Sequence, residues 1–306
     1  MEAHDRIAPY IHHTPVYTNE NIDRLTGARV YFKCENFQKV GAFKARGGTN
    51  AVLCLNDEER VHGVATHSSG NHAQAVAMAA RQNGLKAYIV MPSNSAQVKK
   101  DAVKGYGAQL IECEPTLEAR ERSLQEVISE TGATLIHPYN DYRIIEGQGT
   151  AAKELLESIN TPLDYIMTPV GGGGLLSGTA LLTSYMSPST KVIGCEPEGA
   201  DDAYRSFKTG SLIPQTKPNT IADGLRTSLG DKPFEIIKPH VDDILLANDD
   251  EIIRAMRLVW ERMKIIIETS SAVPLAVLLK NKEKFKDRHI GIILSGGNVD
   301  IKNLPF

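Results

Sequence analysis

The chain has 306 residues, of which 42% are hydrophobic and 23% are charged, and its formal net charge is −3. This length allows one large domain or two of ordinary size, and the composition is that of a soluble globular enzyme. The weak negative charge argues against nucleic acid or an anionic membrane as the partner. No apolar run is long enough to span a membrane, and no targeting segment is recognisable, so we expect a cytoplasmic protein.

The cysteines lie far apart in the sequence and include no C-x-x-C pair. They are Cys34, Cys54, Cys113 and Cys195. This scatter predicts reduced, packed thiols rather than disulfides or a zinc site.

Short apolar strands and amphipathic helices alternate along the first half of the chain. The predicted helices span residues 19–25, 45–55, 71–82, 96–106 and 116–131. The predicted strands span residues 29–35, 63–66, 86–91, 109–113 and 134–137. This alternation is typical of a parallel sheet that helices cover on both faces.

A second series of the same kind follows. Its predicted helices span residues 148–159, 175–186, 249–264 and 271–280, and its predicted strands span 165–170, 191–196 and 290–295. Residues 197–231 are rich in Gly, Pro and Thr and predict a functional loop. Two series predict two α/β lobes with a cleft between them. Ligands of such sheets bind beyond the carboxyl ends of the strands.

A polar loop, residues 68–72, joins a predicted strand to an Ala-rich helix. Its sequence is Ser-Ser-Gly-Asn-His. Backbone N–H groups at a helix start lack partners within the helix and lie at the positive end of its dipole, so the loop suits an anion. A serine-rich N-cap turn without a ligand fits the same residues.

Four consecutive glycines, residues 171–174, follow a strand and open a helix. Glycines let the backbone approach a ligand closely and point several N–H groups at it, so we expect a phosphate here. A flexible turn or close strand–helix packing is the alternative. The spacing matches neither the dinucleotide motif nor the triphosphate motif.

Lys44 stands at the start of a predicted helix, between Phe43 and Ala45. The helix dipole disfavours a cation at this position, and burial beside Phe43 would lower the pKa of the amine further. A neutral amine can form a Schiff base. A solvated surface lysine is the alternative.

Two later segments carry weaker signals. Ser295 ends a buried strand and could contact a ring nitrogen or cap a turn. The loop over residues 196–202 alternates carboxylates with carbonyls, which suits a hard divalent cation but also a solvated helix start. His12, His13 and His137 have no partner at metal-ligand spacing, so we expect structural or surface roles for them.

Taken together and in this order, the F-K-x-R-G, S-S-G-N-H, G-G-G-G and S-G-G-N segments resemble the fold type II pyridoxal-phosphate enzymes, and among them the serine racemase and serine/threonine dehydratase family. The similarity runs from Thr14 to Asp300. It implies an α/β fold like that of the tryptophan synthase β subunit: two doubly wound lobes with mainly parallel sheets and an active site in the cleft. It also implies a large cofactor-binding domain of residues 1–53 and 142–306 and a small domain of residues 54–141.

The resemblance also implies roles for single residues. Lys44 would hold the cofactor and act as the base on one face of the substrate Cα, and Ser69 would stand on the other face. The cofactor-binding residues would be Lys44, Asn71, Gly171, Gly172, Gly173, Gly174, Leu175 and Ser295. The substrate carboxylate would be bound by Ser68, Ser69, Gly70, Asn71 and His72. A divalent cation (Mg²⁺, Mn²⁺ or Ca²⁺) would be bound by Glu196, the Ala200 carbonyl and Asp202.

The implied reaction is the dehydration of a serine- or threonine-type amino acid to a 2-oxo acid and ammonia, with racemisation of serine, by a homodimer. The chain departs from the family pattern at Ala42, Thr269 and the segment with Tyr142, Arg143 and Glu146. Arg143 could bind a second carboxylate, as a 3-hydroxyaspartate dehydratase would need.

Two other functions fit the same fold. One is a β-replacement synthase similar to cysteine synthase, but the surroundings of Lys44 and the loop over residues 68–72 fit dehydratases better. The other is a non-catalytic protein that binds an amino acid or a phosphate. The presence of both Lys44 and Ser69 argues against it.

Overall fold

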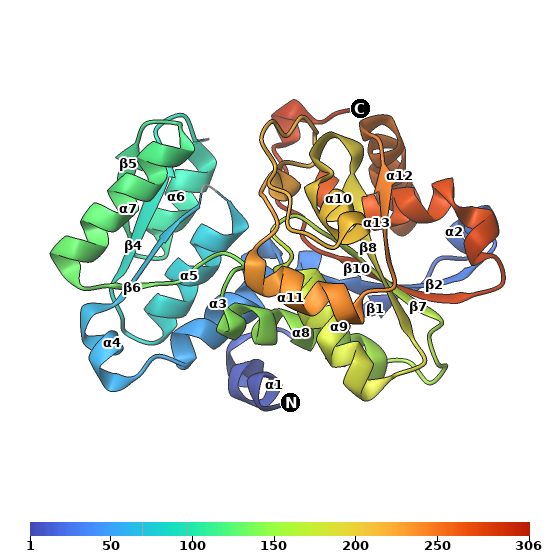
Figure 1. Ribbon diagram of the computed structural model, residues 1–306, viewed down its shortest axis with the longest axis horizontal. Coiled ribbons are helices and arrows are strands. Elements are labelled where there is room, and N and C mark those ends of the chain that lie inside the picture. The colour runs from blue at the N-terminus through green and yellow to red at the C-terminus, as the bar shows by residue number, and fades with distance from the viewer. Residues whose placement is uncertain (69, 96) are drawn as a thin grey trace.

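The computed structural model describes residues 1–68, 70–95 and 97–306 (Figure 1). Its described strands form two separate sheets, one in each lobe, and every described pairing except that of β1 with β2 is parallel. The prediction of an α/β fold with mainly parallel sheets is confirmed. None of the described helices is both long and apolar enough to cross a bilayer.

The larger sheet has the strand order β1-β2-β10-β7-β8-β9. Its strands are β1 (Val16–Tyr17), β2 (Arg29–Cys34), β7 (Tyr165–Pro169), β8 (Lys191–Pro197), β9 (Asp243–Ala247) and β10 (His289–Leu294). Consecutive strand residues point to opposite faces. Ile193 of β8 therefore packs into the core under α12 (Asp249–Met263) and α13 (Thr269–Lys280), while Val192 packs into the core under α9 (Gly174–Met186) and α11 (Asp231–His240).

The smaller sheet has the strand order β5-β4-β3-β6. Its strands are β3 (Val64–His67), β4 (Ala87–Pro92), β5 (Gln109–Cys113) and β6 (Thr134–Leu135). Ile89 packs beneath α5 (Asn71–Gln82) and α6 (Gln97–Gly105), whereas Val90 packs beneath α7 (Leu117–Thr131). Both sheets thus bury both faces, which explains why their strands lack polar alternation.

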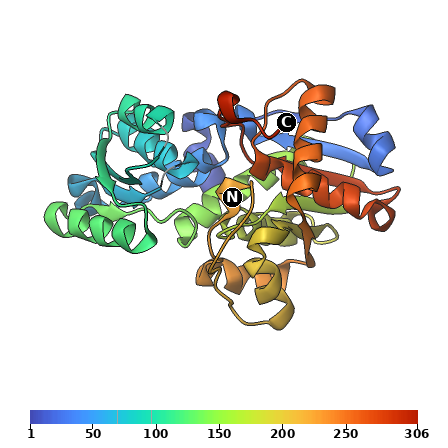
Figure 2. The same ribbon diagram turned by 90° about the horizontal axis from the view of Figure 1, so that it is seen from above.

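Helix α3 (Lys44–Leu53) lies between the two sheets in Figures 1 and 2 and packs against α5 of the small lobe and α8 (Tyr142–Glu157) of the large lobe. Glycines allow the contact with α8: a Cβ at Gly147 would lie 2.6 Å from the Cα of Gly47. Two residues further along, on the other side of α8, a Cβ at Gly149 would lie 2.7 Å from the carbonyl oxygen of Gly178 in α9. Helices α3, α8 and α9 therefore touch backbone to backbone.

The remaining helices are short. They are α1 (Glu2–Ile7), α2 (Glu20–Thr26), α4 (Asp57–His62) and α10 (Asp202–Thr209), with 3-10 turns η1 (Ala8–Tyr10), η2 (Glu35–Phe37), η3 (Lys39–Gly41), η4 (Glu198–Ala200), η5 (Asp223–Leu225), η6 (Lys282–Phe285) and η7 (Ile301–Asn303). Asn19 caps α2 through its side chain, as the sequence indicates.

Several predicted boundaries are wrong. Helix α8 begins at Tyr142 rather than at residue 148, because the Asp141 side chain accepts a hydrogen bond from the Arg143 N–H and caps the helix earlier. The predicted loop over residues 197–231 contains α10, and the sequence analysis also missed α1, α4, α11 and β9. Short helices in Gly- and Pro-rich surroundings give little periodic signal.

The two sheets lie on either side of the expected domain division. The strands of the smaller sheet span residues 64–135, and those of the larger sheet lie before and after them in the chain. The boundaries at residues 53 and 141 stay a prediction.

Candidate active site

Lys44 is half-buried at the first position of α3, where the chain enters the space between the lobes. Its Nζ donates a hydrogen bond of 2.7 Å to the carbonyl oxygen of Pro138, and it lies 5.1 Å from the centre of the Phe43 ring. Burial lowers the pKa of Lys44 to about 8, against the opposing effect of the Glu268 carboxylate. A substantial part of the amine is therefore neutral near physiological pH.

Glu268 is the functional candidate that sequence reasoning missed. It lies at the N-cap of α13, and both carboxylate oxygens accept hydrogen bonds from the Asn71 side-chain amide, at 3.2 and 3.1 Å. The backbone N–H of Asn298 also donates to it, at 3.2 Å. Burial raises the pKa of Glu268 to about 7. In the sequence, an acidic residue before a helix is indistinguishable from an ordinary N-cap residue.

Asn71 connects the two lobes at the carboxyl ends of their strands. Besides its bonds to Glu268, its side-chain oxygen accepts a hydrogen bond of 2.9 Å from the Asn298 amide. Asn298 follows β10, and Asn71 opens α5 after β3. The predicted cofactor-binding residue Asn71 therefore lies beside the acidic group nearest to Lys44.

His72, the second residue of α5, has a buried imidazole ring that is held in its neutral form. The Nε2 of His72 lies 3.0 Å from the carbonyl oxygen of Ile136, so Nε2 carries the proton and Nδ1 presents a lone pair. Burial lowers the pKa of His72 well below its usual value. Any contribution of His72 to an anion must come from its backbone N–H. Gly70 N–H donates to the Ser68 hydroxyl at 3.3 Å, and Ser69 lies outside the described residues.

The glycine turn is shaped by close neighbours. Gly173 has a φ of 92°, and a Cβ at Gly172 would overlap the ring of Tyr139. The described residues supply no acceptor for the N–H groups of Gly172, Gly173, Gly174 and Leu175. Free N–H groups at a helix start form an anion site.

Ser295 is buried at the end of β10, beside a hydroxyl that the sequence did not single out. Its Oγ lies 3.0 Å from the Oγ of Ser271, which donates to the Gly296 carbonyl oxygen and accepts from the Gly296 N–H, each at 2.7 Å. The carbonyl oxygen of Ser295 accepts from the Phe43 N–H at 2.9 Å. The structure thus places the predicted ring-nitrogen partner next to the segment that carries Lys44.

Two buried carboxylates lie in the acidic loop. Glu196 accepts hydrogen bonds from the N–H groups of Ala203 and Tyr204, and Asp202 accepts one from Leu229 N–H. The Oδ1 of Asp202 is buried without a partner among the described residues. Burial raises the pKa of Asp202 to about 6 and that of Glu196 well above its usual range. Such desolvated carboxylates fit a cation.

A metal site built only from side chains is not seen. Within residues 1–68, 70–95 and 97–306, no group of three or more His, Cys, Asp or Glu side chains is close enough to hold a metal ion. A cation at Glu196 and Asp202 would therefore need oxygen ligands from the backbone and from water.

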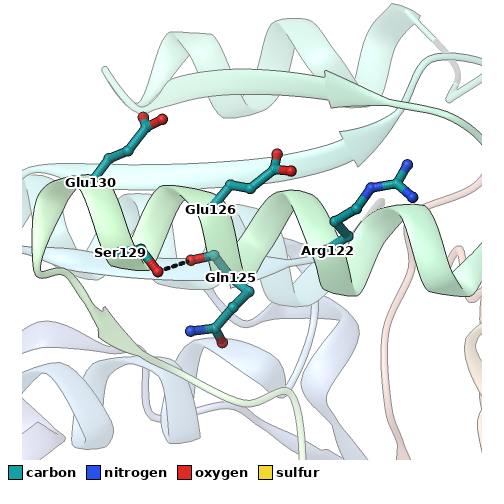
Figure 3. A pocket seen from close by; sticks show the side chains of 5 residues that line it. All are labelled: Arg122, Gln125, Glu126, Ser129 and Glu130. Carbon is teal, nitrogen blue, oxygen red and sulfur yellow. Dashed lines mark hydrogen bonds between the residues drawn. The ribbon is translucent and has the colours of Figure 1, made fainter.

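The hollow in Figure 3 lies outside this site. Its side chains all come from α7: Arg122, Gln125, Glu126, Ser129 and Glu130. The Ser129 hydroxyl donates to the Gln125 carbonyl oxygen of the same helix, at 2.8 Å. The hollow thus brings together no groups from different elements, and we assign no chemistry to it.

A sequence profile of pyridoxal-phosphate dependent enzymes matches residues 7–296. The chain belongs to this family. It is 51% identical over 306 residues to a β-hydroxyaspartate dehydratase of Paracoccus denitrificans, with 100% of this chain and 97% of the relative covered. It is 46% identical over 303 residues to an L-threo-3-hydroxyaspartate ammonia-lyase of Saccharomyces cerevisiae, with 99% and 93% covered.

A solved structure of the same family superimposes closely. The crystal structure of serine racemase from Dictyostelium discoideum has a TM-score of 0.94 and 51% sequence identity, and 98% of this chain and 97% of that chain are covered. The predicted two-lobe fold type II architecture is therefore confirmed.

The residues at the strand ends fit pyridoxal phosphate. The Lys44 amine suits the aldehyde, the free N–H groups of the glycine turn suit the phosphate, and the buried Ser295 hydroxyl suits the ring nitrogen. The assignment of each residue to each group stays a prediction.

Proposed function

We propose that this pyridoxal-phosphate enzyme dehydrates a β-hydroxy amino acid to a 2-oxo acid and ammonia and also racemises serine. The observation that carries the proposal is the Lys44 amine at the start of α3, which donates to the Pro138 carbonyl oxygen at 2.7 Å and whose pKa burial lowers to about 8. A general base is most effective when its pKa lies near the working pH. The names of the relatives support the same class of reaction.

The chain's own groups would act as follows. Bound pyridoxal phosphate withdraws electrons from the substrate Cα. The loop over residues 68–72 would hold the substrate carboxylate through backbone N–H groups, with the neutral His72 ring fixed on Ile136. Lys44 would take the proton from Cα, and Glu268 would hold Asn71 in place across the cleft. Ser69 as the base on the other face stays a prediction.

Arg143 is badly placed for a second substrate carboxylate. Its Nε and Nη2 donate to both oxygens of Asp141, at 2.8 to 3.2 Å, and its Nη1 lies 3.9 Å from Glu59. Two carboxylates therefore already compensate its charge, and the Asp141 contact belongs to the cap of α8. Another cation must serve if the substrate is dicarboxylic.

Arg120 is the better candidate. It is half-buried in the first turn of α7, and it forms no ion pair with the described residues. Its Nε donates to the Thr116 carbonyl oxygen at 3.3 Å. Burial is the main influence on the pKa values of His67 and Tyr139, and the opposite charges of Arg120 and the adjacent Glu121 also act on both. His67 precedes the loop over residues 68–72, and Tyr139 covers the glycine turn. We infer that Arg120 recognises the second carboxylate of 3-hydroxyaspartate.

A substrate panel tests both proposals. Serine, threonine and 3-hydroxyaspartate would be assayed for 2-oxo acid, and serine also for its enantiomer, with the wild type and the Lys44→Ala, Arg120→Ala and Arg143→Ala variants. We expect Lys44→Ala to abolish turnover of every substrate. Arg120→Ala should lower kcat/KM for 3-hydroxyaspartate about 100-fold, since a charge-assisted bond contributes about 1.5–3 kcal/mol, and should change serine turnover little.

Arg143→Ala is the matched control. It removes an arginine of similar exposure and should leave the ratio of the activities unchanged. Appreciable turnover by Lys44→Ala would refute the assignment of the base, and equal losses on serine and 3-hydroxyaspartate would refute the role of Arg120. Colourless protein that does not bind added pyridoxal phosphate would support a non-catalytic binding protein instead.

A divalent cation at Glu196, the Ala200 carbonyl and Asp202 is part of the proposal. The partnerless Oδ1 of Asp202 and the raised pKa values of both carboxyl groups support it. Mg²⁺ and Ca²⁺ both prefer such oxygen ligands.

A further inference from the structure

A cluster of four charged side chains is buried next to the segment that carries Lys44. It consists of Lys33, Glu35, Arg46 and Glu154, whose side chains are at most 2% exposed. Its formal charge is zero, with two cations and two carboxylates. Burial alone would raise the pKa of Glu154. The hydrogen bonds and ion pairs that Glu154 forms with Arg46 and Lys33 outweigh burial and lower this pKa to about 2. The reaction chemistry proposed above uses none of these four groups.

Arg46 is the centre of this cluster. Its Nε donates to Glu35 at 2.7 Å, its Nη2 donates to Glu35 at 2.8 Å and to Glu154 at 2.7 Å, and its Nη1 donates to Glu154 at 2.7 Å and to Thr150 at 3.1 Å. These five short bonds engage all five N–H donors, and a longer sixth contact joins Nη2 to the Thr14 hydroxyl at 3.5 Å. The planar guanidinium is therefore held in two bidentate pairs that point in different directions.

The partners of Arg46 come from separate parts of the large lobe. Glu35 follows β2, whereas Thr150 and Glu154 lie on α8. Lys33 completes the cluster by donating to Glu154 and to the Thr14 carbonyl oxygen, each at 2.6 Å. The cluster thus joins α3 both to the sheet and to α8.

The α3–α8 contact needs such directional bonds. Where the helices cross, Gly47 faces Gly147, so polar bonds rather than interlocking apolar side chains join them: Gln148 accepts from the Gly47 N–H at 3.1 Å, and Asn50 donates to the Arg143 carbonyl oxygen at 2.6 Å. The start of α3 has no side-chain cap, because its N-cap residue is Phe43. Arg46 adds directional bonds at this uncapped end of α3, two residues from Lys44.

Stability alone does not require this arrangement. Buried ion pairs are often replaced by apolar groups without loss of stability, because taking charges out of water offsets their attraction. What an apolar substitute cannot supply is a fixed direction.

We propose that Arg46 is a positioning residue for Lys44: its five bonds fix the rotation of α3 against α8 and so hold the amine of Lys44 between the loop over residues 68–72 and the glycine turn. The proposal rests on the role of Lys44 in the proposed function. It predicts that Arg46 acts on the environment of Lys44, and not only on the stability of the fold.

Three variants separate position from stability. Arg46→Lys keeps the charge but loses the two bidentate pairs. Arg46→Met/Glu35→Met keeps the cluster neutral and leaves the Lys33–Glu154 pair, which lies at 2.6 Å, in place. Phe285→Leu perturbs a buried side chain that packs on Tyr165, away from α3. It serves as the control for general destabilisation.

The main readout needs no bound cofactor. Competitive acetylation of cofactor-free protein, read at the Lys44 peptide by mass spectrometry, gives the pH at which the amine becomes reactive. We expect a midpoint of about 8 for the wild type and for Phe285→Leu. For both Arg46 variants we expect a midpoint at least about one pH unit higher, since a displaced α3 exposes the amine to water.

Kinetics and melting provide the second readout. With pyridoxal phosphate bound, we expect kcat of Arg46→Lys to fall about 100-fold, since a small displacement of a catalytic group lowers the rate by about this factor. KM should stay within about threefold of the wild-type value. The double variant should regain the melting temperature of the wild type but not its kcat.

Two outcomes would overturn the proposal. One is a wild-type acetylation midpoint in Arg46→Lys. The other is recovery of both midpoint and kcat by the double variant, which would make the cluster a stability element only. If the wild type has no elimination activity, the proposed function fails, but the acetylation midpoints still show whether Arg46 controls Lys44.

Discussion

Lys44, which is half-buried, and Glu268, which is buried, have pKa values that desolvation shifts in opposite directions, so that both lie near neutral pH. Burial lowers the pKa of Lys44 to about 8 and raises that of Glu268 to about 7. Near neutral pH each therefore has a substantial neutral fraction, so a proton moves to or from either group at little cost. The buried carboxyl group also makes the stability of the cofactor-free protein depend on pH.

Glu268→Gln tests this dependence. The folded-state pKa of Glu268, about 7, lies above its usual value of 4.5, so the folded state binds more protons than the unfolded state between these values. The contribution of Glu268 to the free energy of unfolding is then most favourable below about pH 4.5 and falls by up to about 3 kcal/mol as the pH rises through 7. Urea unfolding of the cofactor-free wild type and variant should show their stability difference growing in favour of Gln over this range.

Glu130→Gln is the control, because Glu130 is exposed on α7. A difference between Glu268→Gln and wild type that stays constant from pH 4.5 to 8 would contradict the raised pKa.

At the scale of elements, three helices are positioned by backbone contact. α3 meets α8 at Gly47 and Gly147, and α8 meets α9 at Gly149 and Gly178. One of these helices begins at Lys44, and another begins at the glycine turn. The glycines therefore set the distance between the amine and the glycine turn, while Arg46 fixes the rotation of α3.

Gly147→Ala is expected to destabilise the protein by about 2–3 kcal/mol, because the new Cβ would lie 2.6 Å from the Gly47 Cα and 2.8 Å from the Arg46 carbonyl oxygen. Neither backbone atom can move without separating the helices. Gly105→Ala in α6 is the matched control, since a Cβ there meets nothing within 4 Å and alanine favours the helix by about 1 kcal/mol. Thermal unfolding of both variants measures the difference, and equal melting temperatures would refute close packing.

On the scale of the whole molecule, the segment over residues 219–230 connects the parts of the site. Gly230 N–H donates to the Gly172 carbonyl oxygen, and Leu229 N–H donates to Asp202. Asp223 forms an ion pair of 3.4 Å with Lys99 of the small lobe, and Asn71 of the small lobe bonds to Glu268 of the large lobe. A cation at Asp202 would thus stabilise a segment that contacts both the glycine turn and the other lobe.

We expect millimolar Ca²⁺ or Mg²⁺ to raise the melting temperature of the wild type by several degrees. A cation at 100 times its Kd adds about 2.7 kcal/mol to the free energy of unfolding. In a chain of this size, each kcal/mol raises the melting temperature by about 2 °C. Asp202→Asn should lose this rise. Asp201→Asn should keep it, because Asp201 is half-exposed and pairs with Arg205 instead. The same rise in both variants would place the cation elsewhere.

Patterns of neighbouring residues were sufficient to predict much of the fold and part of the candidate site. The alternation of strands and helices predicted both parallel sheets, and α5 and β5 have the predicted bounds. The placement of Lys44 at a helix start and of glycines between β7 and α9 was also readable, because both depend on neighbours in the chain. Arg143 as the partner of a second carboxylate stays a prediction, and Asp141, two residues away, already binds its guanidinium.

The sequence by itself determined the existence and order of most strands and helices near the site, with the bounds of α5 and β5, because propensity, capping and periodicity act over a few residues. Only the tertiary structure brought Glu268 to Asn71, Ser271 to Ser295, and Arg46 to Glu154. These groups come from different elements, so their pairing depends on how the helices and sheets pack. The shifts in the pKa values of Lys44 and Glu268 were decided there too, because burial is a property of the packed molecule.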